Sequence, residues 1–226
     1  MTVSLVIPAF DAAATLGETL DSVAAQDRVP DEVIVVDDGS VDGTADLARA
    51  HSVVSRLIGQ PNGGAARAIN TGIAAARGAW IAILDADDLL PSGSIRARLD
   101  AAGAETDAVI GMLESFLCPS LPAASASRLR WKDGRQRGFV GGAMLLRASL
   151  LDRVGPFDDS LRTGFFIEWF GRAQASGMRI AETDAVVLRR RIRKGTLGAR
   201  TGAGDGLSRD MLEIARRRIA ERRRHG

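Results

Sequence analysis

The chain has 226 residues, of which 46% are hydrophobic and 26% are charged, and its net charge is +2. This composition is typical of a folded globular protein and excludes an intrinsically disordered chain, and no apolar run approaches the roughly 18 residues of a membrane-spanning helix. The N-terminal segment lacks the basic region of a signal peptide, so we expect a cytoplasmic protein. Cys118 is the only cysteine, which excludes an internal disulfide.

Strand-like and helical patterns alternate over the first hundred residues. Strands are expected at 3–8, 32–40 (ending in turn residues), 53–58 and 80–84, and helices at 15–26, 44–51 and 64–78. Strict alternation of strand and helix implies right-handed crossovers and neighbouring parallel strands. The sequence therefore predicts an α/β fold with a mainly parallel sheet.

The alternation weakens after Leu99. We expect a strand at 107–117, a loop or lid at 118–138, a Gly pair with a strand and a short helix within 138–161, a helix at 165–177, an edge strand at 179–193 and a terminal helix at 208–224. No internal repeat interrupts this order. We therefore treat residues 1–226 as one domain.

Three of the expected strands end in residues suited to ligand binding. Phe10 and Asp11 follow the first strand, Asp38 is among the turn residues that end the second, and Asp85, Asp87 and Asp88 follow the fourth. Parallel sheets bind ligands outside the carboxyl ends of their strands, where these residues should meet.

The Asp-x-Asp after the fourth strand has two interpretations. Hard cations take oxygen ligands, so Asp85 and Asp87 could hold Mg²⁺ or Mn²⁺, with substrate phosphates completing its coordination. Alternatively, these carboxylates cap and charge a helix that begins near Pro91.

Two further motifs point to a nucleotide. Asp38 could accept hydrogen bonds from a base or ribose, or it could form an Asx-turn near Thr44. Gly63 and Gly64 lead into a helix whose first amides, together with Arg67, could face a diphosphate. The chain has no Walker lysine motif and no G-x-G-x-x-G after its first strand, so the common ATPase and dinucleotide-binding folds are not indicated.

The segments "VSLVIPAFDAAATLGETLDSVAAQ", "EVIVVDDGSVDGT", "NGGAARAINTGIAAARGAWIAILDADD" and "VGPFDDSL" together resemble the successive motifs of the family 2 glycosyltransferases. The resemblance implies the GT-A fold. Within this one domain we expect a nucleotide-sugar-binding half (1–100), an acceptor-side half (101–200) and a basic C-terminal helix (201–226). It also implies a metal-dependent, inverting transfer from a nucleotide diphosphate sugar, here expected to be a UDP-sugar, to an unidentified acceptor.

The resemblance also assigns roles to single residues. Pro8, Phe10 and Asp11 would line the base pocket, Asp38 would bind the base, Asp85 would lie near the ribose, Asp87 would ligate the metal, and Asp88 would share one of the last two tasks. A divalent cation suits this chemistry, because a nucleoside diphosphate leaves readily only once its charge is neutralised.

The chain departs from the family pattern at the acidic pair that usually follows the "FD" segment. Phe165 and Phe166 occupy the matching positions, and Glu168 is the only carboxylate left in that helix. We predict that Glu168 is the general base, because a carboxylate among aromatic residues can have a useful pKa. Its alternative is a solvent-facing helix residue, and a nucleotide-binding pseudoenzyme or assembly subunit is the alternative function.

A second departure lies in "RRRIRKGTLG", where some similar enzymes carry a histidine that completes the metal site. Arg193 occupies that place, and arginine cannot ligate a cation. We expect Arg193, assisted by Arg191 and Lys194, to contact the diphosphate. The alternative is a basic edge strand that faces water.

The C-terminal end is strongly basic. From Val186 onward the chain has 13 Lys and Arg against 4 Asp and Glu. The expected helix at 208–224 could lie on an anionic membrane, or it could simply pack on the domain through a few aliphatic residues. Nucleic-acid binding is not expected, because no aromatic residue stands among these arginines.

Overall fold

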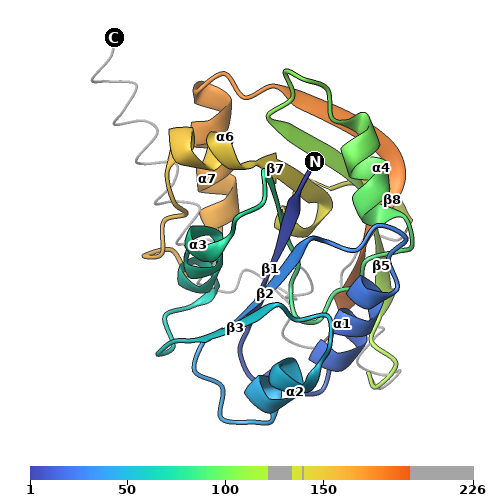
Figure 1. Ribbon diagram of the computed structural model, residues 1–226, viewed down its shortest axis with the longest axis vertical. Coiled ribbons are helices and arrows are strands. Elements are labelled where there is room, and N and C mark those ends of the chain that lie inside the picture. The colour runs from blue at the N-terminus through green and yellow to red at the C-terminus, as the bar shows by residue number, and fades with distance from the viewer. Residues whose placement is uncertain (122–133, 139, 194–226) are drawn as a thin grey trace.

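The computed structural model describes residues 1–121, 134–138 and 140–193 (Figure 1). In this part of the chain eight strands form one sheet in the order β3-β2-β1-β4-β7-β5-β6, and β8 pairs with β5. The strands are β1 (Val3–Ala9), β2 (Glu32–Asp37), β3 (Arg56–Gly59), β4 (Trp80–Ile83), β5 (Ala108–Leu117), β6 (Arg135–Arg137), β7 (Met144–Arg147) and β8 (Ile180–Ile192).

Helices cover both faces of the sheet (Figure 1). One hydrophobic core contains side chains of α1 (Leu16–Ala24), α2 (Thr44–Ala50) and α4 (Ser94–Ala101), and the other contains side chains of α3 (Ala65–Ala75), α6 (Ala148–Val154) and α7 (Phe165–Ala175). A short 3-10 helix, η1 (Gly141–Ala143), precedes β7. The result is a three-layer α/β/α arrangement.

The sheet is mixed. β1 is parallel to β2 and β4, and β2 is parallel to β3, as the alternation predicted. β7 lies between β4 and β5 and is antiparallel to both, whereas β8 is parallel to β5. The antiparallel β7 joins the strands of the second half to the same sheet, so both halves of the chain contribute to each of the two cores.

The central strand β1 shows why this sequence forms a buried parallel sheet. Leu5 and Ile7 point into the core beneath α1, and Val6 points into the core beneath α3. Both faces are covered, which explains a continuous apolar run in place of an alternating one. A Cβ at Gly72 of α3 would lie 2.3 Å from Val6 Cγ1, so only glycine allows α3 to approach β1 this closely.

The structure differs from the sequence-based prediction at several boundaries. Part of the expected loop at 118–138 forms β6, which pairs with β5. The helix expected near Pro91 begins at Ser94 and has no side-chain cap, so the capping interpretation of Asp85, Asp87 and Asp88 is wrong. The terminal helix expected at 208–224 lies outside the described residues.

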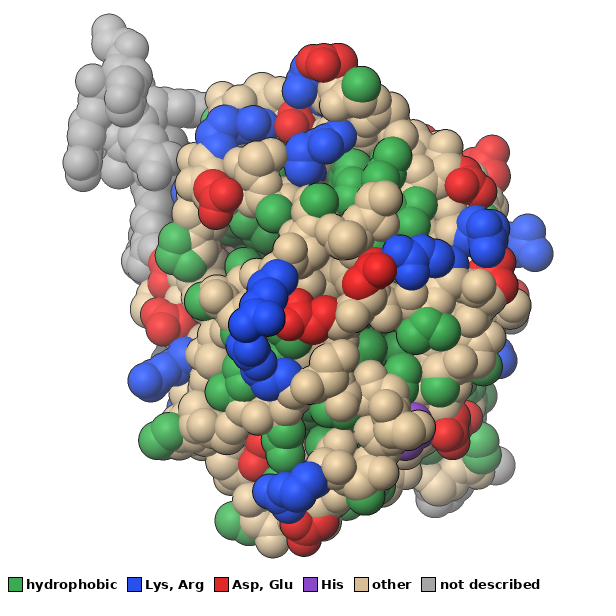
Figure 2. All heavy atoms as spheres, viewed as in Figure 1, with side chains coloured by type: hydrophobic (Ala, Val, Ile, Leu, Met, Phe, Trp, Pro, Cys, Tyr) green, Lys and Arg blue, Asp and Glu red, His purple; other side chains and the backbone are tan. Residues whose placement is uncertain are grey.

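No helix in the described segments is long and apolar enough to cross a membrane. On the face viewed in Figure 2, Lys and Arg side chains are interspersed with Asp and Glu.

Candidate functional site

A pocket of about 380 Å³ opens where β1, β2 and β4 end. Its lining comprises Pro8, Ala9, Phe10, Ala12, Asp38, Asn62, Gly64, Ala65, Ala68, Asp85, Ala86, Asp87 and Arg193. The three strand ends singled out from the sequence therefore meet at one site. Phe10 is 52% exposed, which leaves an aromatic ring accessible at the pocket.

Asp38 is buried and its carboxylate is already hydrogen-bonded to the chain. Oδ1 accepts from Gln60 Nε2 at 2.7 Å and from the Gly63 amide at 2.9 Å, and Oδ2 accepts from the Gly64 amide at 2.7 Å. The two glycine amides that could have faced a diphosphate are thus bonded to Asp38. In the structure Asp38 holds the turn that leads into α3.

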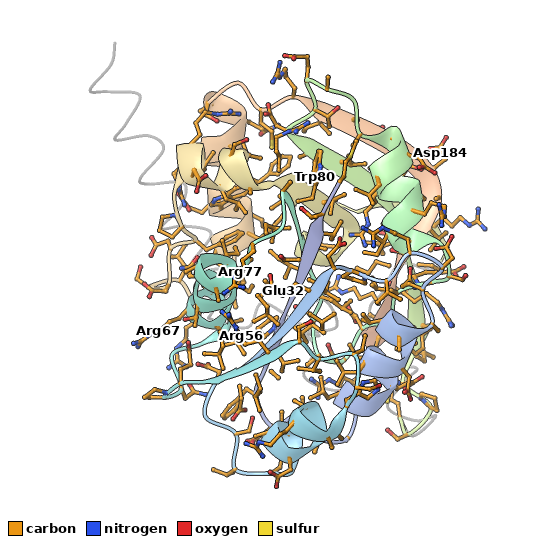
Figure 3. The ribbon with its side chains drawn as sticks, viewed as in Figure 1. Glu32, Arg56, Arg67, Arg77, Trp80 and Asp184 are labelled. Atoms are coloured by element: carbon orange, nitrogen blue, oxygen red, sulfur yellow. The ribbon has the colours of Figure 1, made fainter. Side chains whose placement is uncertain are left out.

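Asp11 and Arg67 do not line the pocket. Asp11 has a φ of 45°, and its Oδ1 accepts a 2.9 Å hydrogen bond from the Val41 amide, which ties the loop after β1 to the loop after β2. Arg67 is exposed, its stem packs over Gly63, and Figure 3 shows it at the outer edge of the molecule. Both residues border the site without facing into it.

Polar side chains of α1 and of residues just before and after it hold the aspartate loop (85–91) from one side. The hydroxyls of Thr15 and Thr19 donate to the Ala86 carbonyl at 2.9 and 3.1 Å. Gln26 Nε2 donates to the Leu90 and Pro91 carbonyls at 3.1 and 2.9 Å. We did not predict this role from the sequence. The spacing of three or four residues could have indicated a shared polar face, which comprises Thr15, Thr19, Ser22 and Gln26.

The end of β8 holds the aspartate loop from the other side. Arg191 is only 3% exposed; its amide donates to Asp88 Oδ1 and its Nε donates to the Asp87 carbonyl, both at 2.8 Å. Its guanidinium also pairs with Glu18 of α1. The alternative of a basic edge strand that faces water is therefore wrong for Arg191. This residue is buried and supports the aspartate loop.

Arg193, two residues further on, lies in the pocket itself. Its Nε is 2.7 Å from Asp87 Oδ2, and its side chain is 51% exposed. Of the three arginines predicted to contact a diphosphate, Arg67, Arg191 and Arg193, only Arg193 lines the pocket.

Negative charge is concentrated on the aspartate loop. Crowding by surrounding protein atoms and repulsion from Asp87 raise the pKa of Asp85 to about 6, although Arg190 and Arg193 partly offset this and Asp85 is itself an exposed residue at the pocket. Burial and the nearby Asp85 raise the pKa of Asp88 well above its usual range. Arg190 is a basic neighbour of the site that sequence reasoning missed.

The carboxylates of Asp85 and Asp87 fit a hard divalent cation. Both line the pocket, and a cation between them would relieve the repulsion that raises the Asp85 pKa. No group of three or more His, Cys, Asp or Glu side chains within the described segments is placed to hold a metal. A cation held by Asp85 and Asp87 alone would take its remaining ligands from substrate phosphates and water. Asp88 is 4% exposed and does not line the pocket.

Glu168 lies in the first turn of α7 and is bonded to Arg172. Arg172 Nε and Nη2 donate to its two carboxylate oxygens at 2.7 and 2.9 Å. Arg172 also donates to the Val154 and Pro156 carbonyls, so the pair fixes α7 to the preceding loop. Glu168 does not line the pocket, and its role as the general base stays a prediction.

Comparison with known proteins places this architecture in a family. The model of glycosyl transferase family 2 matches residues 4–155. The chain is 32% identical over 219 residues to the succinoglycan biosynthesis protein ExoO of Rhizobium meliloti, covering 86% of this chain and 62% of that protein. It is 29% identical over 199 residues to the glycosyltransferase AglE of Haloferax volcanii, covering 82% of this chain and 65% of that protein. The chain thus spans less than two thirds of the length of either relative.

Solved structures share the fold. The TM-score is 0.72 at 18% identity with S. aureus TarS 1–349 in complex with UDP-GlcNAc, covering 95% of this chain and 64% of that one. It is 0.64 at 24% identity with the mannosyltransferase PcManGT from Pyrobaculum calidifontis in complex with GDP-Man and Mn²⁺, covering 86% and 58%. Both likenesses bear on the fold, which is GT-A. With the family model matching most of its length, the chain belongs to glycosyl transferase family 2.

Proposed function

We propose that the chain transfers a sugar from a nucleotide diphosphate sugar, with a UDP-sugar as the expected donor. The observation that carries this proposal is the meeting of an exposed aromatic ring, Phe10, with the carboxylates of Asp85 and Asp87 in one pocket at the strand ends. An aromatic face suits a nucleobase, and paired carboxylates suit the cation of a diphosphate. Solved relatives in complex with UDP-GlcNAc and with GDP-Man support a donor of this class.

Residues in the pocket and beside it have distinct places in this proposal. Phe10 stacks on the base and Pro8 packs beside it, while Asp38 and Asp11 hold the surrounding loops. Asp85 and Asp87 would hold Mg²⁺ or Mn²⁺, which when bound neutralises the charge of the leaving diphosphate. Arg193 donates hydrogen bonds to the phosphate oxygens, since a guanidinium matches their geometry.

The acceptor would attack the anomeric carbon from the side opposite the diphosphate, which inverts its configuration. The acceptor is unidentified, and we expect the second half of the chain to bind it. Glu168 is the carboxylate expected to take the acceptor's proton, and to do so it would have to leave its pair with Arg172.

A thermal-shift screen of nucleotides and nucleotide sugars, with and without Mn²⁺ or Mg²⁺, tests donor binding. Because a ligand at 100 times its Kd adds about 2.7 kcal/mol of stability, a true donor should raise the Tm by roughly 5–10 °C. We expect UDP-sugars to do so only with the cation. No shift with any nucleotide sugar would contradict the proposal.

One observation favours a second candidate, a nucleotide-binding pseudoenzyme or assembly subunit. Phe165 and Phe166 occupy the places of the acidic pair, and Arg172 holds both oxygens of Glu168. Release of free sugar from a bound donor in the presence of metal would favour the enzyme, because even slow hydrolysis requires activation of the leaving group. Binding without any turnover across the donor panel would favour the second candidate.

Two expectations about location stay predictions. The cytoplasmic location is one, and the weak contact of residues 208–224 with anionic membranes is the other. Co-sedimentation with anionic vesicles, compared between the full chain and a chain ending at 207, would test the second.

A further inference from the structure

The ion pair between Arg193 and Asp87 lies where a donor diphosphate and its cation are expected. Arg193 Nε is 2.7 Å from Asp87 Oδ2, and both residues line the pocket. The Asp87 side chain is 16% exposed and that of Arg193 is 51% exposed. The guanidinium of Arg193 is thus paired with the Asp87 carboxylate, which a cation would need as a ligand.

The two partners differ in how firmly they are held. The Asp87 carbonyl accepts from buried Arg191, and the neighbouring Ala86 carbonyl accepts from Thr15 and Thr19, so the backbone under the Asp87 carboxylate is fixed. Arg193 follows the last residue of β8, and half of its side chain surface reaches solvent. A rearrangement of the pair would therefore move the side chain of Arg193 and leave Asp87 in place.

We propose that Arg193 makes cation binding depend on the nucleotide. Without a nucleotide, Arg193 neutralises Asp87 and competes with a divalent cation for it; when a diphosphate enters, the guanidinium turns to the phosphate oxygens and releases Asp87 to the cation. This inference rests on the proposed function and adds an order of assembly to it.

Charge and chemistry support this exchange. Arginine cannot coordinate a cation and stays protonated at every physiological pH. Its competition with the cation for Asp87 therefore does not depend on pH in this range. A cation bound to Asp87 would also be repelled by the nearby guanidinium of Arg193. An incoming diphosphate offers that guanidinium a new anionic partner, and guanidinium–phosphate hydrogen bonds are among the stronger polar contacts.

Two binding measurements on the full chain test the proposal without any transfer reaction. Electron paramagnetic resonance of free Mn²⁺ gives the affinity for Mn²⁺ alone, and calorimetry with UDP and with GDP gives nucleotide affinity in the presence of Mn²⁺. We expect Arg193→Gln to bind Mn²⁺ alone more tightly, on the order of tenfold, and to bind the nucleotide more weakly by a similar factor. A merely structural role for Arg193 would weaken both.

Arg189→Gln is the matched control. Arg189 lies on the same strand and is also exposed, but its guanidinium stacks on Phe116 at 4.8 Å. Both affinities should stay as in the unmodified chain. Arg193→Lys, which keeps the positive charge, should retain the weak binding of Mn²⁺ alone and provides the test if Arg193→Gln does not fold.

Different results overturn different claims. Unchanged or weaker binding of Mn²⁺ alone by Arg193→Gln would overturn the competition between Arg193 and the cation. Failure of the unmodified chain to bind UDP or GDP with Mn²⁺ would overturn the proposed function instead, whatever the Mn²⁺ affinities.

Discussion

The backbone amide of Arg191 donates a 2.8 Å hydrogen bond to Oδ1 of Asp88, 103 residues earlier in the chain. Beside it, Leu89 and Arg189 exchange two backbone hydrogen bonds of 2.9 Å, a single antiparallel bridge between the aspartate loop and β8. The position of the Asp-x-Asp therefore depends on a strand from the far end of the described chain.

Arg191→Met tests this dependence. The change removes the hydrogen bond to the Asp87 carbonyl and the pair with Glu18, so we expect the free energy of unfolding to fall by about 1–3 kcal/mol. Because Asp87 loses its support, nucleotide affinity in the presence of Mn²⁺ should also fall. Urea denaturation and calorimetry measure the two effects. Glu18→Gln, which keeps Arg191 and changes a side chain that is 59% exposed, should have a much smaller effect on both.

Asp87→Asn should remove cation-dependent nucleotide binding while the fold survives. The side chain contributes one ion pair at the pocket, so its loss should change stability by no more than about 1 kcal/mol. Calorimetry with UDP and Mn²⁺ checks the binding, and thermal denaturation checks the fold. Asp46→Asn, at a surface ion pair on α2, is the control and should bind as before. Undiminished Mn²⁺-dependent affinity in Asp87→Asn would show that the cation is held elsewhere.

Asp38→Asn distinguishes a supporting role from direct contact with the base. An amide group cannot accept from Gln60, Gly63 and Gly64 together as the carboxylate does, so we expect a loss of about 1–3 kcal/mol in stability along with weaker nucleotide binding. Urea denaturation and calorimetry again provide the readouts. Lost binding at full stability would instead favour the direct contact with the base that the sequence suggested.

Glu168→Gln separates the two roles open to this residue. We expect a stability loss of about 1 kcal/mol, because glutamine cannot accept both hydrogen bonds from Arg172. If Glu168 is also the base, transfer should slow on the order of 10²–10⁴-fold while donor affinity is unchanged. Arg172→Gln keeps the carboxylate and should not slow transfer in this way, although it should lose more stability because Arg172 also donates to the Val154 and Pro156 carbonyls. A near-normal transfer rate in Glu168→Gln would move the base elsewhere.

Asp107 provides a pH-dependent prediction about the fold. Its burial opposes ionisation, but hydrogen bonds from Arg179 and the pair with Arg153 outweigh this and lower its pKa below the usual 3.8. A lowered pKa stabilises the fold above pH 3.8, and that contribution is lost as the pH falls through the folded-state pKa. Asp107→Asn should thus cost about 2 kcal/mol at pH 7 and progressively less as the pH falls below 3.8, as measured by urea denaturation. A cost that does not change with pH would contradict the assigned ionisation.

The sequence by itself determined the fold class and the location of the pocket. Alternating strand and helix patterns are local signals, and they predict parallel strands whose carboxyl ends share one edge. Phe10, Asp38, Asp85 and Asp87 each follow such a strand, so their meeting in one pocket follows from topology alone. The motifs that resemble family 2 glycosyltransferases lie mostly in this same regular half.

Only the tertiary structure decided what the individual charged residues do. Arg191 and Arg193 are the same residue type two positions apart, yet one lies buried beneath the aspartate loop and the other lies in the pocket. Likewise, both oxygens of Asp38 are bonded to a turn more than twenty residues away in the chain. These roles come from contacts between segments that are distant in sequence, and no local pattern of side chains encodes which distant backbone groups will need a partner.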